Sequence, residues 1–212
     1  MGGILPPRNH PEAAIDFAQD APLPLASRVL VCLGWAAFFV VFVLRRKPSR
    51  KGETKRDPVS RLGIFLQMAG FCAVWMVQRP IPRAGTTPGA AEIAADVLAP
   101  ILSAVSVGLG LWAVRTLGRQ WSYTARLVED HRLVQEGPYA FVRHPIYTAM
   151  LGKLLAVAAS FGSAPGLAIA APLFLAGTRI RVRSEEKLLE GQFGGAFADY
   201  ARRVPAFIPF LK

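Results

Sequence analysis

The chain has few of the residues that build disulfide scaffolds, metal centres and soluble surfaces. Only two of its 212 residues are cysteine, three are histidine, and 18% are charged. Cys32 and Cys72 each lie inside an apolar block, not in a Cys-x-x-Cys pair, which argues against a disulfide or a metal site. We expect both to be small, buried apolar residues. Soluble domains carry roughly a quarter charged residues, whereas 52% of this chain is hydrophobic, so the composition indicates a membrane protein.

Acidic residues are scarce beside basic ones. Asp and Glu number 14 against 25 Lys and Arg, which gives a formal charge of +11. Such an excess suits either nucleic acid or an anionic membrane surface. The basic residues stand in short stretches between uncharged apolar blocks, and no basic face interleaved with aromatic residues occurs. We therefore expect anionic membrane lipids as partners, and no nucleic acid.

Five apolar blocks approach the roughly 20 residues that a bilayer-spanning helix needs. They cover residues 27–44, 62–77, 93–114, 146–161 and 165–177. Only Gly162, Ser163 and Ala164 separate the last two, which predicts an antiparallel helical hairpin. The predicted fold class is all-α, a polytopic membrane protein with five transmembrane helices.

The basic residues also predict the orientation, because Lys and Arg concentrate in cytoplasmic loops. The loop between the first two blocks holds eight of them: Arg45, Arg46, Lys47, Arg50, Lys51, Lys55, Arg56 and Arg61. The next loop has only Arg79 and Arg83, and the hairpin tip has none. This pattern predicts an N-terminus outside and a C-terminus in the cytoplasm. Richness in Ala, Arg and Gly indicates a high-GC bacterial source, and hence the inner membrane.

The chain divides into three predicted segments: a proline-rich tail over 1–26, a transmembrane bundle over 27–182 that includes a polar loop over 115–147, and a cytoplasmic segment over 183–212. The tail lacks the apolar core of a signal peptide. In the last segment, apolar residues recur at helical spacing at Phe193, Phe197, Tyr200 and Val204. This spacing predicts an amphipathic helix.

The polar loop ends in an unusual run of residues from His131 to Tyr147. Gly137-Pro138 predicts a turn and Pro145 a helix start, and two histidines, an arginine and two tyrosines stand around them. Such a group at the membrane surface suits a pocket for a polar cofactor. It also suits an interfacial loop whose Tyr and Arg anchor the helix ends, which composition by itself favours.

A second polar cluster follows the fifth apolar block. Arg181 and Glu185 are four residues apart, so a continuous helix places them on one face. They form either an exposed ion pair of little energetic value or a ligand site, since charged groups beside an apolar hairpin are retained for function. These residues alone leave both interpretations open.

The motifs are far more specific in combination than singly. HxLV, GPY, RHPxY, RxxxEE, FG and YxxRVP occur in this order from His131 to Pro205. Over about residues 117–212 the chain resembles the isoprenylcysteine carboxyl methyltransferase family. The resemblance implies an integral-membrane methyltransferase that uses S-adenosylmethionine and no metal. The acceptor that it implies is a lipophilic or lipid-linked carboxylate of the isoprenylcysteine type.

The resemblance also implies which residues form the site. The implied cofactor-binding residues are His131, Arg132, Leu133, Val134, Tyr139, His144, Pro145, Ile146, Tyr147 and Glu185. Arg181 is implied to bind the methyl acceptor, with Arg181 and Glu185 as the catalytic pair. The family has a glutamine seven residues before the motif histidine, where this chain has Thr124.

Three other functions remain open from the sequence. Gly108-Leu-Gly110 followed by Glu185-Glu186 also resembles phosphatidylethanolamine N-methyltransferases, although two glycines in a spanning helix more often mark close helix packing. The Arg-His-Pro-x-Tyr element resembles sterol reductases, which use NADPH. A membrane protein whose basic loops only bind anionic lipid is the non-enzymatic alternative.

Overall fold

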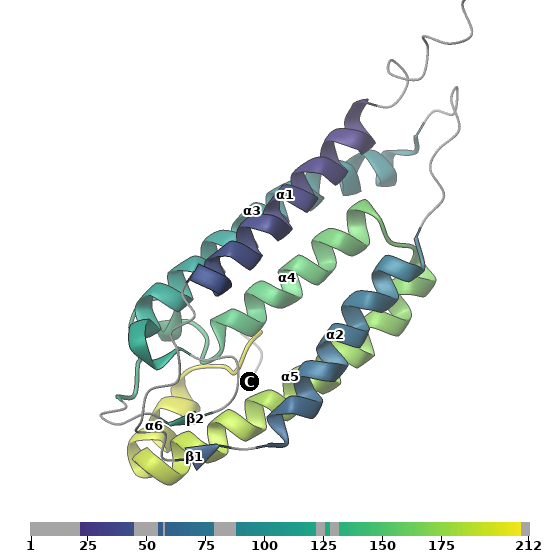
Figure 1. Ribbon diagram of the computed structural model, residues 1–212. Helices are drawn as coiled ribbons and strands as arrows, with labels where there is room; N and C mark the ends of the chain where they lie inside the picture. The colour runs from purple at the N-terminus through teal and green to yellow at the C-terminus, as the bar shows by residue number, and fades with distance from the viewer. Residues whose placement is uncertain are drawn as a thin grey trace, which may run out of the picture.

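In the part of the chain that its computed structural model describes, the protein has six α-helices. The structure describes residues 22–44, 55–56, 58–78, 88–121, 126–127 and 132–208. The helices are α1 (Pro22–Leu44), α2 (Ser60–Met76), α3 (Ala90–Leu117), α4 (Pro145–Ser160), α5 (Ala164–Phe193) and α6 (Gly195–Arg203). Two short strands, β1 (Lys55–Arg56) and β2 (Arg126–Leu127), pair antiparallel beside α6 (Figure 1). The predicted all-α class is confirmed.

The helices form two groups with α4 between them. α3 packs along both α1 and α4, and α2 packs along α5 (Figure 1). Buried apolar side chains from all five long helices meet in one core cluster: Val31, Phe71, Val74, Ala99, Leu154, Val157, Ala170 and Phe174. A second cluster at the α6 end joins α1, α3 and α4 through Phe38, Phe42, Val114, Trp121 and Ala149.

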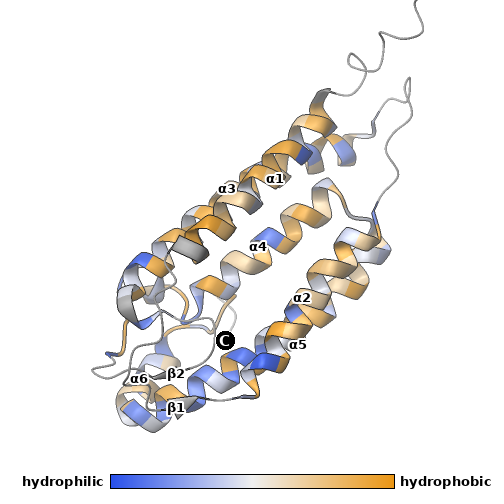
Figure 2. Cartoon of the chain, viewed as in Figure 1, coloured by the Kyte–Doolittle hydropathy of each residue, from blue (hydrophilic) through white to orange (hydrophobic). Residues whose placement is uncertain are grey.

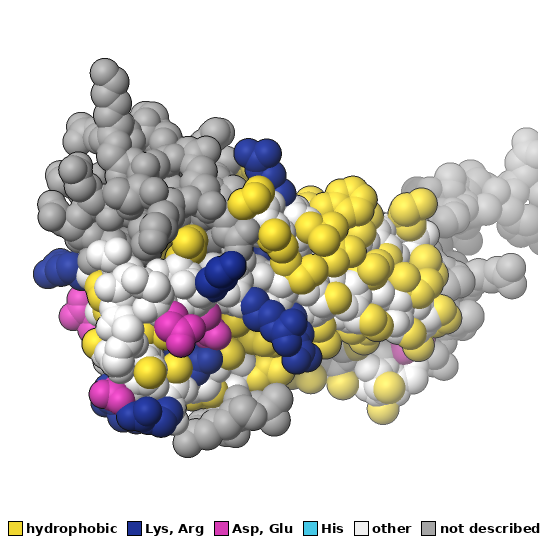
Figure 3. All heavy atoms as spheres, turned by 90° about the horizontal axis from the view of Figure 1, so that it is seen from below, with side chains coloured by type: hydrophobic (Ala, Val, Ile, Leu, Met, Phe, Trp, Pro, Cys, Tyr) yellow, Lys and Arg dark blue, Asp and Glu magenta, His cyan; other side chains and the backbone are white. Residues whose placement is uncertain are grey.

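The outer surface of the helices is apolar, as in a membrane protein. Phe39, Phe65 and Met76 have exposed fractions of 66%, 68% and 83%, and the helices are apolar along most of their length (Figure 2). Apolar side chains cover the long part of the face drawn in Figure 3, and charged ones gather toward the α6 end. Residues 23–42 and 90–117 are long and apolar enough to cross a bilayer, and α2 and α4 are shorter apolar helices.

α5 is longer than the fifth predicted block because it continues through the polar residues after Gly177. It runs for 30 residues, so Arg181 and Glu185 stand on one continuous helix with the apolar block. Ser163 begins it: its Oγ accepts a hydrogen bond from the Gly166 N–H at 3.2 Å. The connection to α4 is as short as predicted, but α5 packs chiefly on α2.

The predicted amphipathic helix is present as α6, whose Phe197 and Tyr200 are buried while Arg202 and Arg203 are exposed. It begins two residues later than the predicted spacing because Gly194 separates it from α5. Gly194 has φ 50°, in the left-handed region that glycine adopts without strain.

Two expectations about small residues need correction. Cys32 and Cys72 are exposed, not buried, and lie on outward faces of α1 and α2. The packing interpretation holds for Gly110, where a Cβ would lie 2.9 Å from Cε2 of Phe38. It is wrong for Gly108, where an added Cβ would meet no atom of the described residues within 4 Å.

Candidate active site

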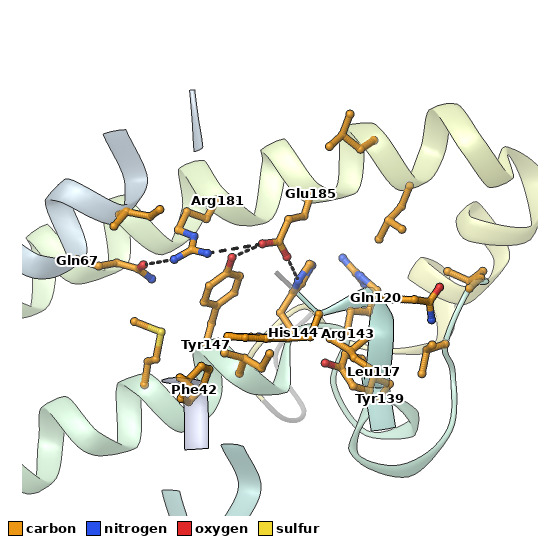
Figure 4. Close-up of a pocket in the computed structure, with 18 of the residues that line it drawn as sticks. Phe42, Gln67, Leu117, Gln120, Tyr139, Arg143, His144, Tyr147, Arg181 and Glu185 are labelled. Atoms are coloured by element: carbon orange, nitrogen blue, oxygen red, sulfur yellow. Dashed lines mark hydrogen bonds and ion pairs between the residues drawn. The ribbon is translucent and has the colours of Figure 1, made fainter. Parts of the chain in front are cut away.

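A cavity of about 330 Å³ lies between the two helix groups at the α6 end. Most of its polar side chains come from α2, α4, α5 and the segment before α4, and Gln120 after α3 and Tyr200 on α6 add to them (Figure 4). Its apolar lining comes mainly from α1, α2, α4 and α5: Trp35, Phe38, Phe39, Phe42, Ile64, Met68, Ile146, Met150, Leu188 and Leu189. One cavity therefore joins a charged end to a long apolar wall.

The turn before α4 is shaped by close contacts with α3. Gly137 has φ 59° and opens a 3-10 turn over Gly137–Ala140 that buries Tyr139. A Cβ at Gly137 would lie 2.9 Å from Oγ1 of Thr116, so this position favours glycine for both its backbone angle and its space. Further upstream, Oε1 of Gln120 accepts a hydrogen bond from the Arg132 N–H at 2.6 Å.

The C-terminal tail holds this turn from the other side. The N–H groups of Arg143 and His144 donate to the carbonyls of Pro205 and Ala206 at 2.9 and 2.8 Å. The Tyr200 hydroxyl donates to the carbonyl of Tyr139 at 2.7 Å. Residues that are 61 or more positions apart in the sequence therefore fix the backbone around His144.

His144 lies between two carboxylates. Its Nδ1 is 3.2 Å from Oε2 of Glu185, and its Nε2 is 3.1 Å from Oε1 of Glu186. Carboxylate oxygens only accept hydrogen bonds, so both contacts form together only when both ring nitrogens carry protons. The guanidinium of Arg143 donates to the same Oε1 of Glu186 at 2.9 Å and to the Ala201 carbonyl at 2.9 Å.

Glu185 also has partners on the cavity side. The Tyr147 hydroxyl donates to Oε1 of Glu185, and NH2 of Arg181 lies 4.0 Å from the same oxygen. The Arg181 guanidinium stands over the Tyr147 ring at 4.9 Å from its centroid, a cation–π contact. Arg181 and Glu185 thus face the cavity from successive turns of α5 (Figure 4).

These contacts shift the ionisation of the cluster. Burial opposes a charge on His144, but hydrogen bonds to Glu185 and Glu186 outweigh it and raise the pKa of His144. Burial likewise opposes charge on the two carboxyls, and His144, with Arg181 or Arg143, outweighs it and lowers the pKa of both Glu185 and Glu186. When His144 is protonated, the cluster has three positive groups and two carboxylates, and its net charge is +1. These groups are Arg143, His144, Arg181, Glu185 and Glu186.

Comparison with known proteins finds a family match over the part of the chain that carries this cluster. The model of the isoprenylcysteine carboxyl methyltransferase (ICMT) family matches residues 100–191. These residues make up less than half of the chain. Within them lie α4, the turn before it, and Arg181 and Glu185 on α5.

Three curated relatives are similar to this chain. The cobalt-zinc-cadmium resistance protein of Cupriavidus metallidurans is 33% identical over 117 residues, 54% of this chain and 52% of that protein. The nickel-cobalt-cadmium resistance protein of Alcaligenes xylosoxydans xylosoxydans is 36% identical over 116 residues, 52% of this chain and 53% of that protein. Protein-S-isoprenylcysteine O-methyltransferase B of Arabidopsis thaliana is 33% identical over 106 residues, 47% of this chain and 52% of that protein. The chain spans about half the length of these relatives.

The structure brings most of the residues suggested by the ICMT resemblance to one cavity. Those that line it are Arg132, Leu133, Val134, Tyr139, His144, Ile146, Tyr147, Arg181 and Glu185. Pro145 is buried at the first position of α4 and does not line the cavity. His131 and Thr124 lie outside the described residues.

Many residues that line the cavity had not been assigned a part in the site, among them Arg143, Gln67 and Trp35. Arg143 stood inside the RHPxY motif, in the group that suits either a cofactor pocket or a helix-end anchor, but it was not among the implied site residues. Gln67 and Trp35 sit in apolar blocks outside the family segment, and nothing in its block marks Trp35. The one signal that could have indicated Gln67 is its polar side chain in an otherwise apolar block.

The shifted pKa values predict a pH window for the stabilising effect of His144. Its raised pKa means that its contribution is complete below the ordinary histidine value of 6.5 and is lost as the pH rises through the raised value. The lowered carboxyl pKa values make their contribution complete above 4.5 and lost in stronger acid. We expect the difference in unfolding temperature between wild type and His144→Gln to be largest between pH 4.5 and 6.5 and to shrink above it. A difference independent of pH in thermal unfolding scans would contradict the charged contact.

Proposed function

We propose that the protein is an S-adenosylmethionine-dependent methyltransferase of the membrane, and that it O-methylates the carboxylate of a lipophilic, isoprenylcysteine-like acceptor. One observation carries the proposal. The cavity joins the Arg181–Glu185 pair to a wall of aromatic and aliphatic side chains, which suits a polar reacting group attached to an apolar chain. The ICMT assignment of residues 100–191 supports the reaction class.

The residues at the polar end fit the cofactor. Leu133, Val134 and Tyr139 offer apolar and aromatic surface for an adenine, and Glu185 offers a carboxylate for ribose hydroxyls or an ammonium. The remaining residues that would hold it are His131, Arg132, His144, Ile146 and Tyr147. When bound, S-adenosylmethionine supplies a methyl group on a sulfonium, which the acceptor oxygen takes as the C–S bond breaks and its electron pair stays on sulfur.

The protein's own part in the reaction is to position and to balance charge. Arg181 would pair with the acceptor carboxylate and hold it at the polar end of the cavity. A carboxylate is already ionised near neutral pH, so no residue needs to remove a proton from it. A protonated amine would instead be repelled by Arg181, which favours O-methylation over N-methylation.

We further propose five membrane spans, formed by α1, α2, α3, α4 and the apolar part of α5, with the N-terminus outside and the site on the cytoplasmic side of a bacterial inner membrane. The charged residues of α5 and α6 lie at one end of the bundle (Figures 2 and 3), as the bias of basic residues toward the cytoplasm requires. Basic residues of that end would contact anionic lipid headgroups. The cofactor would then enter from the cytoplasm and the acceptor from the bilayer.

Purified protein incubated with methyl-labelled S-adenosylmethionine and an S-prenylcysteine tests the function. We expect transfer of the label into a base-labile product, because a methyl ester hydrolyses in base and an N-methyl group does not. Label that resists base and appears in phospholipid would favour the N-methyltransferase alternative. NADPH oxidation without any transfer of label would overturn the proposal in favour of a reductase.

A further inference from the structure

Gln67 is a buried polar residue of α2 at the inner end of the Arg181 side chain. Its exposed fraction is 1%. Its Nε2 donates to Oγ1 of Thr178 at 2.9 Å, and its Oε1 accepts from NH1 of Arg181 at 3.1 Å (Figure 4). The nitrogen and the oxygen of the Gln67 carboxamide thus each form a hydrogen bond. Because the guanidinium of Arg181 can only donate, the carboxamide oxygen must face Arg181.

Two glycines bring α2 close enough to α5 for this contact. A Cβ at Gly63 would lie 2.7 Å from the carbonyl oxygen of Gly177, and a Cβ at Gly177 would lie 2.6 Å from that of Gly63. The helix backbones therefore touch one turn before Gln67. Any side chain at these positions would separate the helices and withdraw Gln67 from Arg181.

Gln67 holds Arg181 through a neutral group. Its Oε1 accepts from NH1 of Arg181, while NH2 lies 4.0 Å from Oε1 of Glu185, at ion-pair distance. Glu185 in turn accepts from Tyr147 and contacts His144 at 3.2 Å. An acidic residue in place of Gln67 would put a second negative charge beside the guanidinium and near any anionic ligand.

We infer that Gln67 contributes to acceptor specificity by positioning Arg181: it holds the guanidinium at the wall of the cavity, where an anionic methyl acceptor would bind. The inference rests on the proposed function and deepens it, because it names an anionic group as the feature that the site selects. Gln67 lies outside residues 100–191. On this inference, a residue of the amino-terminal half contributes to the choice of acceptor. Arg181 and Glu185, by contrast, lie within residues 100–191.

The test is Gln67→Glu, which keeps the size and the oxygen but adds a negative charge. We expect the KM for an S-prenylcysteine carboxylate to rise about tenfold or more, since like charges repel strongly in a partly desolvated site. The kcat and the Kd for S-adenosylmethionine should change little. Gln78→Glu is the matched control, because Gln78 lies just after the same helix, is exposed, and its side chain donates to the nearby Trp75 carbonyl.

A binding measurement separates this inference from the proposed function. Tryptophan fluorescence reports acceptor binding without cofactor, since Trp35 and Trp121 line the cavity. We expect Gln67→Glu to weaken binding of the carboxylate about tenfold or more and to leave binding of the matching carboxamide unchanged. Equal losses for both ligands, or no loss for either in a folded variant, would overturn the inference. Failure of wild type to transfer methyl groups would reject the proposed function, while the binding comparison would still decide the part played by Gln67.

Discussion

Replacing Glu185 by glutamine should weaken the binding of S-adenosylmethionine by about 10- to 150-fold, the loss expected for one charge-assisted hydrogen bond. Glu185 contacts His144 and Tyr147 and faces the cavity. Glutamine keeps the shape but removes the negative charge that suits an ammonium or ribose hydroxyls. The measurement is the Kd for the cofactor by calorimetry of the detergent-solubilised protein.

The fold should survive this change because other contacts hold the turn. Arg143 and His144 remain bound to Glu186 and to the carbonyls of the C-terminal tail. Glu190→Gln is the control, since Glu190 is exposed on the same helix. Wild-type affinity in a folded Glu185→Gln protein would show that Glu185 does not bind the cofactor.

Arg181→Met should raise the KM for a carboxylate acceptor by about 100-fold, because loss of one partner of a buried charge pair costs about 2–5 kcal/mol. Cofactor binding should remain within about threefold of wild type, because Arg181 stands 4.0 Å from Glu185 and contributes little to its position. Arg181→Lys should recover part of the loss, since an ammonium keeps the charge but not the planar fork. Steady-state kinetics at saturating cofactor provide the measurement.

The control for the buried Arg181 is a nearby arginine that is exposed to solvent. Arg179 lies two residues earlier on α5 and is exposed, so Arg179→Met changes the net charge equally without touching the cavity. It should leave the KM unchanged. If both variants raise the KM alike, the effect comes from general electrostatics and Arg181 is not the acceptor-binding residue.

The positions of the helices were predictable because a bilayer demands long apolar runs. Four of the five predicted blocks match α1 to α4 within five residues at each end. The extension of α5 beyond the apolar block was not predictable, because its second half is polar and a search for apolar blocks treats such a segment as a loop. Its helical form follows from packing against α2 on one side and the turn around His144 on the other.

The motif residues were predictable for a different reason. His144, Tyr147 and Glu185 were recognised from the order of short motifs, and the structure gathers them because the tail carbonyls of Pro205 and Ala206 bind the turn. The double contact of His144 was not predictable. The RxxxEE motif contains both carboxylates, but only the folded chain shows that each faces a different ring nitrogen.

By itself the sequence determined the membrane class, the α-helical fold and the motif residues of the ICMT segment, because these depend on composition, block length and local order. Only the tertiary structure decided which residues of the amino-terminal half reach the site. Gln67 and Trp35 lie in apolar helices whose sequences show no pattern that distinguishes one helix from the other. The close approach of Gly63 and Gly177 places Gln67 on Arg181, since contacts between distant helices depend on surface shape rather than on residue order.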